Sequence, residues 1–156
     1  MAEDASYKVA YEEGVRALSQ QQSLIDSIRT RAGLLLSAAA ITTSFLGAQA
    51  LRDGDPSVAT WLALAVFAGL SIACLAVLWP HRWEFIADPE NLIEIYIETD
   101  RPASVAELHR DLSLHMHQSF FENRIGRDQL AARLRLAGIL LTADVTIWLI
   151  DLASRA

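Results

Sequence analysis

The sequence predicts an all-α integral membrane protein with three transmembrane helices and a cytoplasmic helical stalk. Three observations support this prediction: three long apolar stretches, an uneven distribution of lysine and arginine, and helical periodicity in the polar segments. The 156-residue chain is 53% hydrophobic, and its charged residues gather in blocks outside the apolar stretches. A chain of this length would fit one soluble domain, but this separation of charged from apolar residues is typical of membrane proteins.

The first two apolar stretches contain no charged residue. Residues 33–51 supply about 19 residues, which at ~1.5 Å per residue match the hydrocarbon thickness of a bilayer. Residues 58–79 follow after a short polar turn, in which the Asp-Gly pair at 53–54 is a turn signal. Asp55 suits an N-cap there, and Pro56 suits the first helical position. The two stretches therefore predict a transmembrane hairpin.

The third apolar stretch, residues 136–152, is the shortest. It holds about 17 residues, at the lower limit for a span, contains Asp144 and ends beside Asp151. Two interpretations follow from its composition: a third transmembrane helix, or a core helix that packs on a soluble part of the chain. We predict the transmembrane helix and keep the second interpretation as the alternative.

The distribution of basic residues predicts the orientation. Of the 13 lysines and arginines, all but two lie in the N-terminal segment or between residues 81 and 135. Because basic residues concentrate on the cytoplasmic side, we expect the N-terminus and both segments in the cytoplasm. Trp79 and Trp83 would then mark the inner interface, and Trp61 would lie near the outer one.

The polar segments predict the stalk. Residues 6–32 read as an amphipathic helix that continues into the first span. In residues 84–135, a short segment over 89–97 fits a helix or a strand, and a capping box at Ser104 and Glu107 then opens a long helix. We expect the apolar stripes of the two long helices to pack together, within one chain or between protomers. These stripes are Tyr11, Val15, Leu18, Ile25, Ile28 and Ala32, and Leu108, Leu112, Met116, Phe120, Ile125, Leu130 and Leu134.

A polar cluster is predicted near the middle of the spans. A carboxylate at the centre of a spanning helix costs on the order of 3 kcal/mol, so Asp144 should face protein or water. Thr42, Thr43 and Ser71 lie at similar depth in the other two spans and complete the predicted cluster. Two interpretations remain open: a proton or ion site, or a protonated carboxyl that hydrogen-bonds within or between protomers.

Small residues repeat at four-residue spacing along the first two spans and permit close helix approach, within the hairpin or in a homo-oligomer. They are Ala40, Ser44 and Ala48 in the first span, and Ala65, Gly69 and Ala73 in the second. Four arginines at the cytoplasmic ends of the spans are predicted to contact lipid head groups or to set topology. These are Arg29, Arg31, Arg133 and Arg135.

Several functional classes find no support in the sequence. The net charge of −6 argues against nucleic-acid binding, which needs a basic surface. The single cysteine, Cys74, and the spacing of His109, His115 and His117 suit no metal site. No phosphate-binding loop and no pairing of a nucleophile with a base is present, so we predict a non-enzymatic protein without a cofactor.

The layout of the chain resembles a known group. Residues 27–36, SIRTRAGLLL, enter the first span, a second span follows closely, and residues 122–136 lead into the last span. In this layout the chain resembles small bacterial membrane proteins related to the Pycsar and SLATT-type effectors of anti-phage defence, as well as integral membrane proteins of the same layout without an assigned role. Relatives often carry an acidic-x-Lys-Ala pattern at the polar-to-apolar junction. Here that stretch reads Arg31-Ala32, with Asp26 upstream.

This resemblance implies a membrane effector that responds to a cytoplasmic signal and impairs the inner membrane. Three functional hypotheses follow. The first is an oligomerising effector of a stress or anti-phage defence system, with the lipid bilayer and copies of itself as partners. The second is a scaffold or accessory subunit whose stalk binds a cytoplasmic protein. The third, a small ion- or proton-coupled transporter, depends on Asp144 alone, because no inverted repeat accompanies it.

Overall fold

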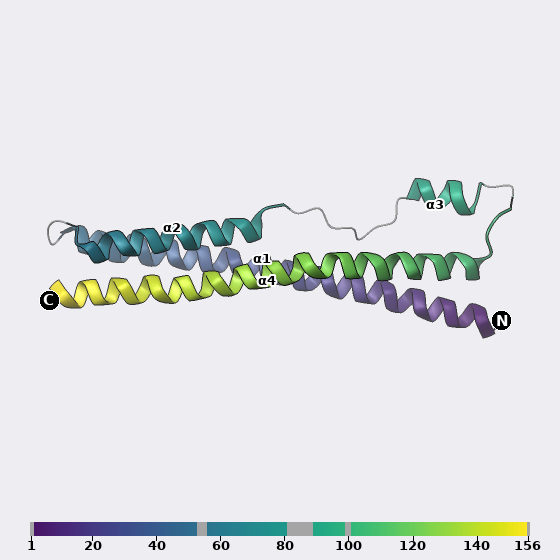
Figure 1. The fold of residues 1–156 in the computed structure, drawn as a ribbon, viewed down its shortest axis with the longest axis horizontal. Helices are drawn as coiled ribbons and strands as arrows, with labels where there is room; N and C mark the ends of the chain where they lie inside the picture. The colour runs from purple at the N-terminus through teal and green to yellow at the C-terminus, as the bar shows by residue number, and fades with distance from the viewer. Residues whose placement is uncertain (1, 53–55, 81–88, 99–100, 156) are drawn as a thin grey trace. The chain divides into compact units, whose positions relative to one another are not determined.

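Four helices make up the computed structural model, which describes residues 2–52, 56–80, 89–98 and 101–155. Figure 1 shows them in chain order: α1 (Ala2–Arg52), α2 (Val58–Leu78), α3 (Pro89–Tyr96) and α4 (Val105–Arg155). Within the described ranges the fold is all-helical, without a strand. By length and composition, α1, α2 and α4 are each able to cross a membrane.

The helices form two compact units, and α1 and α4 contribute to both. The first unit contains α1 up to Ile25, α3, and α4 up to Arg127. The second unit contains α1 from Asp26, all of α2, and α4 from Asp128. Neither α1 nor α4 is interrupted where it passes from one unit to the other.

In the first unit, α1 packs against α4 through small and aromatic side chains. Gly14 faces Met116, whose Cε atom lies 2.9 Å from where a Cβ at Gly14 would be. Tyr11 stacks on His109 with ring centroids 5.1 Å apart. Leu18 and Ile25 are buried on the same face of α1.

Two members of the predicted stripes do not join this packing. Val15 is 46% exposed and Ile125 is 67% exposed. Buried residues on α1 recur at a seven-residue spacing, at positions 18, 25, 32 and 39, and those on α4 recur likewise at 123, 130, 137, 144 and 151. A seven-residue repeat of buried positions is typical of two helices that pack along their length. Because each residue advances about 100° around the helix, Val15 lies to one side of this packed face.

The short segment after the second apolar stretch is a helix, which settles the choice between helix and strand. α3 begins at Pro89, a residue suited to the first turn because its missing N–H is not needed there. The Tyr96 hydroxyl donates to Asp111 Oδ2 at 3.3 Å and fastens α3 to α4. Burial, and secondly the charge of Asp111, raises the pKa of Tyr96. Asp88, the predicted N-cap, lies outside the described residues.

The predicted capping box is confirmed at the start of α4. Glu107 Oε2 accepts from the Ser104 backbone N–H at 2.8 Å, and the Glu107 N–H donates to Ser104 Oγ at 3.3 Å. The hydrogen bond from the Ser104 backbone is the main reason that the pKa of Glu107 lies below its ordinary value.

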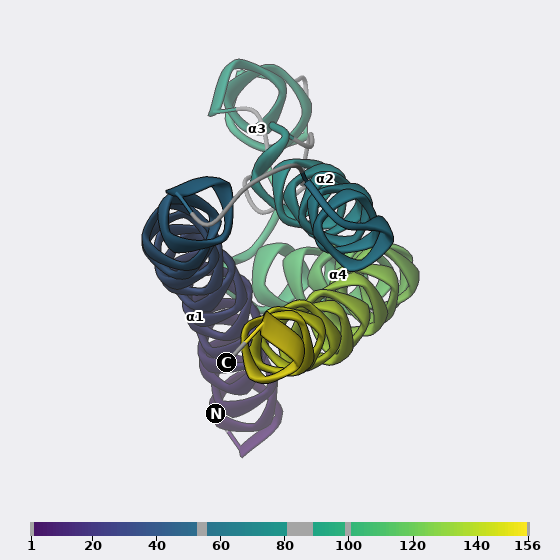
Figure 2. The ribbon, with the colours of Figure 1, turned by 90° about the vertical axis from the view of Figure 1, so that its left-hand side faces the viewer.

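The second unit is a bundle of α1, α2 and α4, which stand at the corners of a triangle in the end view of Figure 2. Among the described residues, its interior includes two apolar layers. One combines Ala39, Leu70, Ala73, Cys74 and Ala137, and the other combines Ala50, Ala63 and Trp148. Small residues dominate both layers, so the helices approach closely, as in tightly packed membrane helices.

The start of α2 differs from the prediction. Its N-cap is Ser57, whose hydroxyl accepts from the Thr60 backbone N–H at 3.1 Å. The prediction that Pro56 occupies the first helical position is therefore wrong, since Pro56 precedes the cap. Residues 53–55, which include the predicted cap Asp55, lie outside the described residues.

Candidate functional site

Asp144 is fully buried in the second unit, with a relative exposure of 0%. Thr43 Oγ1 on α1 lies 3.1 Å from Asp144 Oδ2, and the two form a hydrogen bond. The other carboxyl oxygen, Oδ1, is buried without a hydrogen-bond partner among the described residues. The indole N–H of Trp148, one helical turn further along α4, is buried and unpartnered in the same way. The buried acceptor of Asp144 and the buried donor of Trp148 are thus neighbours on one face of α4.

The structure brings together two of the four residues of the predicted polar cluster, Asp144 and Thr43. Ser71 Oγ instead donates to the backbone carbonyl of Phe67 on its own helix, at 2.9 Å. Thr42 is half-buried and adjoins Thr43 in sequence, so its side chain points about 100° away around α1. Similar depth along the helices was therefore not enough to predict which residues are in contact. The direction in which each side chain points around its helix decides this.

A second buried carboxyl, Asp151, is part of the site although the sequence analysis did not select it. Its side chain is 1% exposed. It accepts hydrogen bonds from the hydroxyl of Ser57 and, at 3.1 Å, from Thr60 Oγ1. A signal was present in the sequence: Asp151 follows Asp144 by seven residues and so shares its face of α4, about 10 Å further along.

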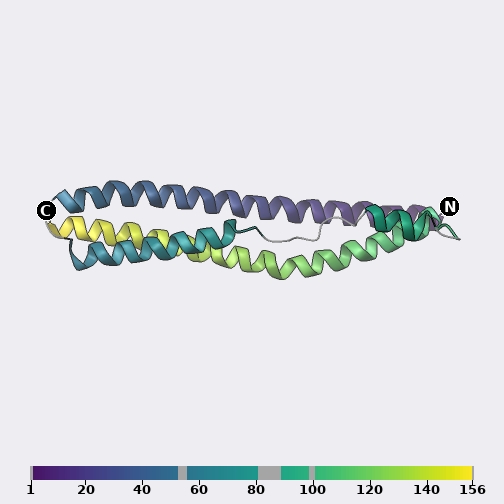
Figure 3. The ribbon, with the colours of Figure 1, turned by 90° about the horizontal axis from the view of Figure 1, so that it is seen from above.

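Both ends of α2 receive charged side chains from α4. α2 carries no acidic residue in its first turn and no basic residue in its last turn. Asp151 lies at the first turn, where free N–H groups carry partial positive charge. Arg133 Nη1 donates at 3.2 Å to the carbonyl of Ala76 in the last turn, where partial negative charge accumulates. Figure 3 shows α2 lying beside the C-terminal part of α4.

The four predicted interface arginines occupy different surroundings. Arg133 is half-buried and bonds to α2, whereas Arg31 and Arg135 are exposed. Arg29 is half-buried, and its Nε has no hydrogen-bond partner among the described residues.

The predicted small-residue stripes also differ in placement. Ala40, Ser44 and Ala48 are all exposed, because α1 packs with the neighbouring face that contains Ala39, Thr43 and Ala50. On α2 the stripe turns gradually into the bundle. Ala65 is exposed, Gly69 is half-buried and Ala73 is buried.

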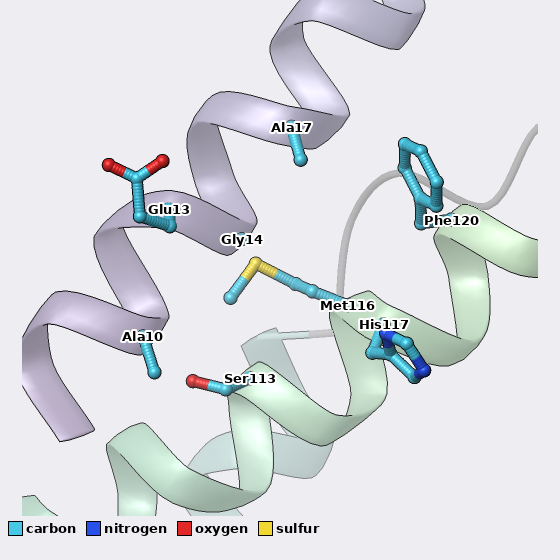
Figure 4. A pocket seen from close by; sticks show the side chains of 8 residues that line it. All are labelled: Ala10, Glu13, Gly14, Ala17, Ser113, Met116, His117 and Phe120. Atoms are coloured by element: carbon cyan, nitrogen blue, oxygen red, sulfur yellow. The ribbon is translucent and has the colours of Figure 1, made fainter.

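The first unit contains an apolar hollow of about 380 Å³ between α1 and α4. In Figure 4 the Met116 side chain reaches across it toward Gly14. Ser113, one of the few polar residues on its wall, donates its hydroxyl to the carbonyl of His109 on the same helix. The other polar residues on the wall are Glu13, which pairs with Arg16, and His117, which packs against Phe121. We therefore interpret the hollow as a gap between packed helices.

In the part of the chain that the structure describes, no group of three or more His, Cys, Asp or Glu side chains is arranged to hold a metal ion. No protein-family model, curated protein or solved structure matches this chain.

Proposed function

We propose that this chain is a non-enzymatic bacterial inner-membrane effector that crosses the bilayer three times and assembles through α1. The N-terminus and the first unit lie in the cytoplasm, where they receive the signal, and the second unit lies in the bilayer. The observation that carries this proposal is the outward-facing row Ala40, Ser44 and Ala48 on a helix whose neighbouring face packs in the bundle.

The contacts at the two ends of α2 support the third span. Arg133 and Asp151 are separated by about 27 Å of helix and reach opposite ends of α2. A 21-residue apolar helix such as α2 needs a bilayer around it, so residues 133–151 cross the same thickness beside it. A reporter that is active only outside the cytoplasm, fused after residue 156, should be active. Activity of a cytoplasmic reporter at that position would restore the two-span alternative.

The exposed face of α1 suits contact with a second copy. Ser37 and Ser44 are exposed seven residues apart, and neither hydroxyl makes a hydrogen bond with the described residues. The hydroxyls of Ser71, Thr142 and Thr146, by contrast, donate to a carbonyl of their own helix. Small side chains let helix backbones approach, and serine hydroxyls then bond across the contact.

Cross-linking tests this assembly directly. In a Cys74→Ala background, Ser44→Cys should form a disulfide-linked dimer in oxidised membranes. The matched control is Ile72→Cys, which lies on the exposed face of α2 and should cross-link much less. Equal cross-linking at the two positions would argue against a contact through α1.

Membrane potential in cells tests the effector activity. Induced expression of the wild-type chain should depolarise cells, and Ala40→Leu should suppress this by blocking the close approach of two α1 helices. Ile41→Leu, at a neighbouring position that is 72% exposed, should leave depolarisation unchanged. Normal membrane potential at high expression of the wild-type chain would refute the effector function.

One observation favours a second function, that of a scaffold subunit. Leu114, Phe121 and Ile125 lie on α4 in the first unit and are all more than half exposed. Their spacings of seven and four place them on one face, as in a helix that docks into a protein groove. Affinity purification in mild detergent should then recover a stoichiometric protein that Phe121→Glu releases. Recovery of the chain alone would remove this alternative.

A further inference from the structure

We propose that α4 holds its two buried carboxyl groups in opposite protonation states at neutral pH, with Asp144 as a proton-binding site and Asp151 as a carboxylate. The inference depends on the three-span part of the proposed function, because a surrounding bilayer withholds the water that would otherwise hydrate either group. It is independent of the effector activity.

The surroundings of Asp151 stabilise a negative charge. Two hydroxyl groups, from Ser57 and Thr60, donate to its two oxygens. It lies at the first turn of α2, which has no acidic residue of its own. The positive end of the helix dipole and two donors together favour the ionised form.

The surroundings of Asp144 provide no comparable support. The donors beside it are the hydroxyl of Thr43 and the indole N–H of Trp148, and no helix begins at its level. The part of α1 that packs here, residues 33–50, contains no titratable side chain. On α2 the only one is Cys74, which belongs to the apolar layer of Ala39 and Ala137. On α4 the nearest is Asp151, two turns away, and no positive charge faces Asp144 from these three helices.

A proton on Asp144 also improves the local hydrogen bonding. The 3.1 Å separation from Thr43 Oγ1 suits donation by the acid O–H as well as by the threonine. The threonine hydroxyl is then free to donate to a carbonyl of its own helix, as Thr142 and Thr146 do.

The proton on Asp144 is shielded from water in the packed bundle, because the carboxyl group and the neighbouring Thr43 and Trp148 side chains are all buried. Its release therefore requires the helices to separate at this level. Binding of a proton to Asp144 is therefore coupled to the separation of α1, α2 and α4 in the second unit. The ligand of this site is a proton.

Infrared spectroscopy of the full chain in lipid nanodiscs tests the proposal. With all aspartates labelled with ¹³C at the side-chain carboxyl carbon, the wild type at neutral pH should show the isotope-shifted C=O stretch of a protonated aspartic acid. Asp144→Asn should lose this band entirely, and Asp151→Asn, the matched control on the same helix face, should keep it. Asp144→Glu should lose the labelled band and gain an unlabelled glutamic acid band.

Three results would overturn the proposal: no protonated band in the wild type, a band that survives Asp144→Asn, or a band that disappears in Asp151→Asn. Circular dichroism establishes that each variant is folded, and the Asp144→Glu band decides the question if Asp144→Asn does not fold. A chain whose C-terminal reporter is active outside the cytoplasm in cells, but which lacks the band in nanodiscs, refutes this inference alone. A chain that does not enter lipid refutes the three-span proposal as well.

Discussion

Replacing Asp151 by asparagine should measurably destabilise the helix bundle of the second unit, because it removes one charge while preserving the shape of the side chain. The loss has two parts. A charge at a partly buried helix terminus is worth up to about 2 kcal/mol, and Asp151 provides it for α2. The amide nitrogen of asparagine donates and does not accept, so one of the bonds from Ser57 and Thr60 is also lost, at roughly 1 kcal/mol. We expect the free energy of unfolding to fall by about 2–3 kcal/mol.

The measurement is an SDS titration of the protein in mixed micelles, followed by tryptophan fluorescence. Trp148 is fully buried, whereas Trp61 and Trp79 are more than 60% exposed, so Trp148 should dominate the change on unfolding. Asp26→Asn, the same substitution at an exposed position, should change the free energy of unfolding by less than about 0.5 kcal/mol. Equal effects of the two substitutions would refute the assignment of Asp151 to the N-terminus of α2.

Three further predictions use the same chain. Gly47→Val should lower the free energy of unfolding by about 1–3 kcal/mol in the SDS titration, because a Cβ there lies 3.4 Å from a buried indole ring. Gly33→Val, with no atom within 4 Å of its Cβ, should have a much smaller effect, and equal losses would contradict the packing. Arg133→Gln should cost about 1–2 kcal/mol by weakening the contact with the last turn of α2, while the exposed Arg135→Gln should change stability by less than about 0.5 kcal/mol. Because the pKa of Glu107 is lowered in the folded chain, its carboxylate stabilises the start of α4 above the ordinary glutamate pKa of about 4.3, and this contribution is lost as the pH falls through the lower folded value. Amide hydrogen exchange in the first turn of α4, corrected for its intrinsic pH dependence, should therefore show falling protection on acidification, and protection unchanged down to pH ~3 would contradict it.

Features determined by neighbouring residues were predictable from the sequence. The capping box at the start of α4 needs only a serine and a glutamate three residues apart, and it forms as predicted. The apolar stretches are likewise local, so three helices long and apolar enough to cross a membrane were expected and are present. The cap of α2 was misassigned because Asp55, Pro56 and Ser57 all suit a helix start. The N-cap in the structure is Ser57, whose hydroxyl forms hydrogen bonds both with the first turn of α2 and with Asp151.

Features that depend on which face of a helix turns inward were not predictable. Ala39 and Ala40 are identical in chemistry and adjacent in sequence, yet the first is buried and the second is exposed. Thr42 and Thr43 present the same ambiguity, and only Thr43 contacts Asp144. In an apolar helix both faces are compatible with lipid, so hydropathy carries no information about the packed side.

The sequence by itself determined that this chain is helical, where its long apolar helices lie, and that Asp144 is costly to place among apolar residues. Only the tertiary structure decided that Asp151 belongs with it and that the charges at both ends of α2 come from α4. The physical reason is that helix formation and capping act over a few residues of one chain segment. The partner of a buried charge is instead set by contacts between helices that are about 60 to 100 residues apart in sequence.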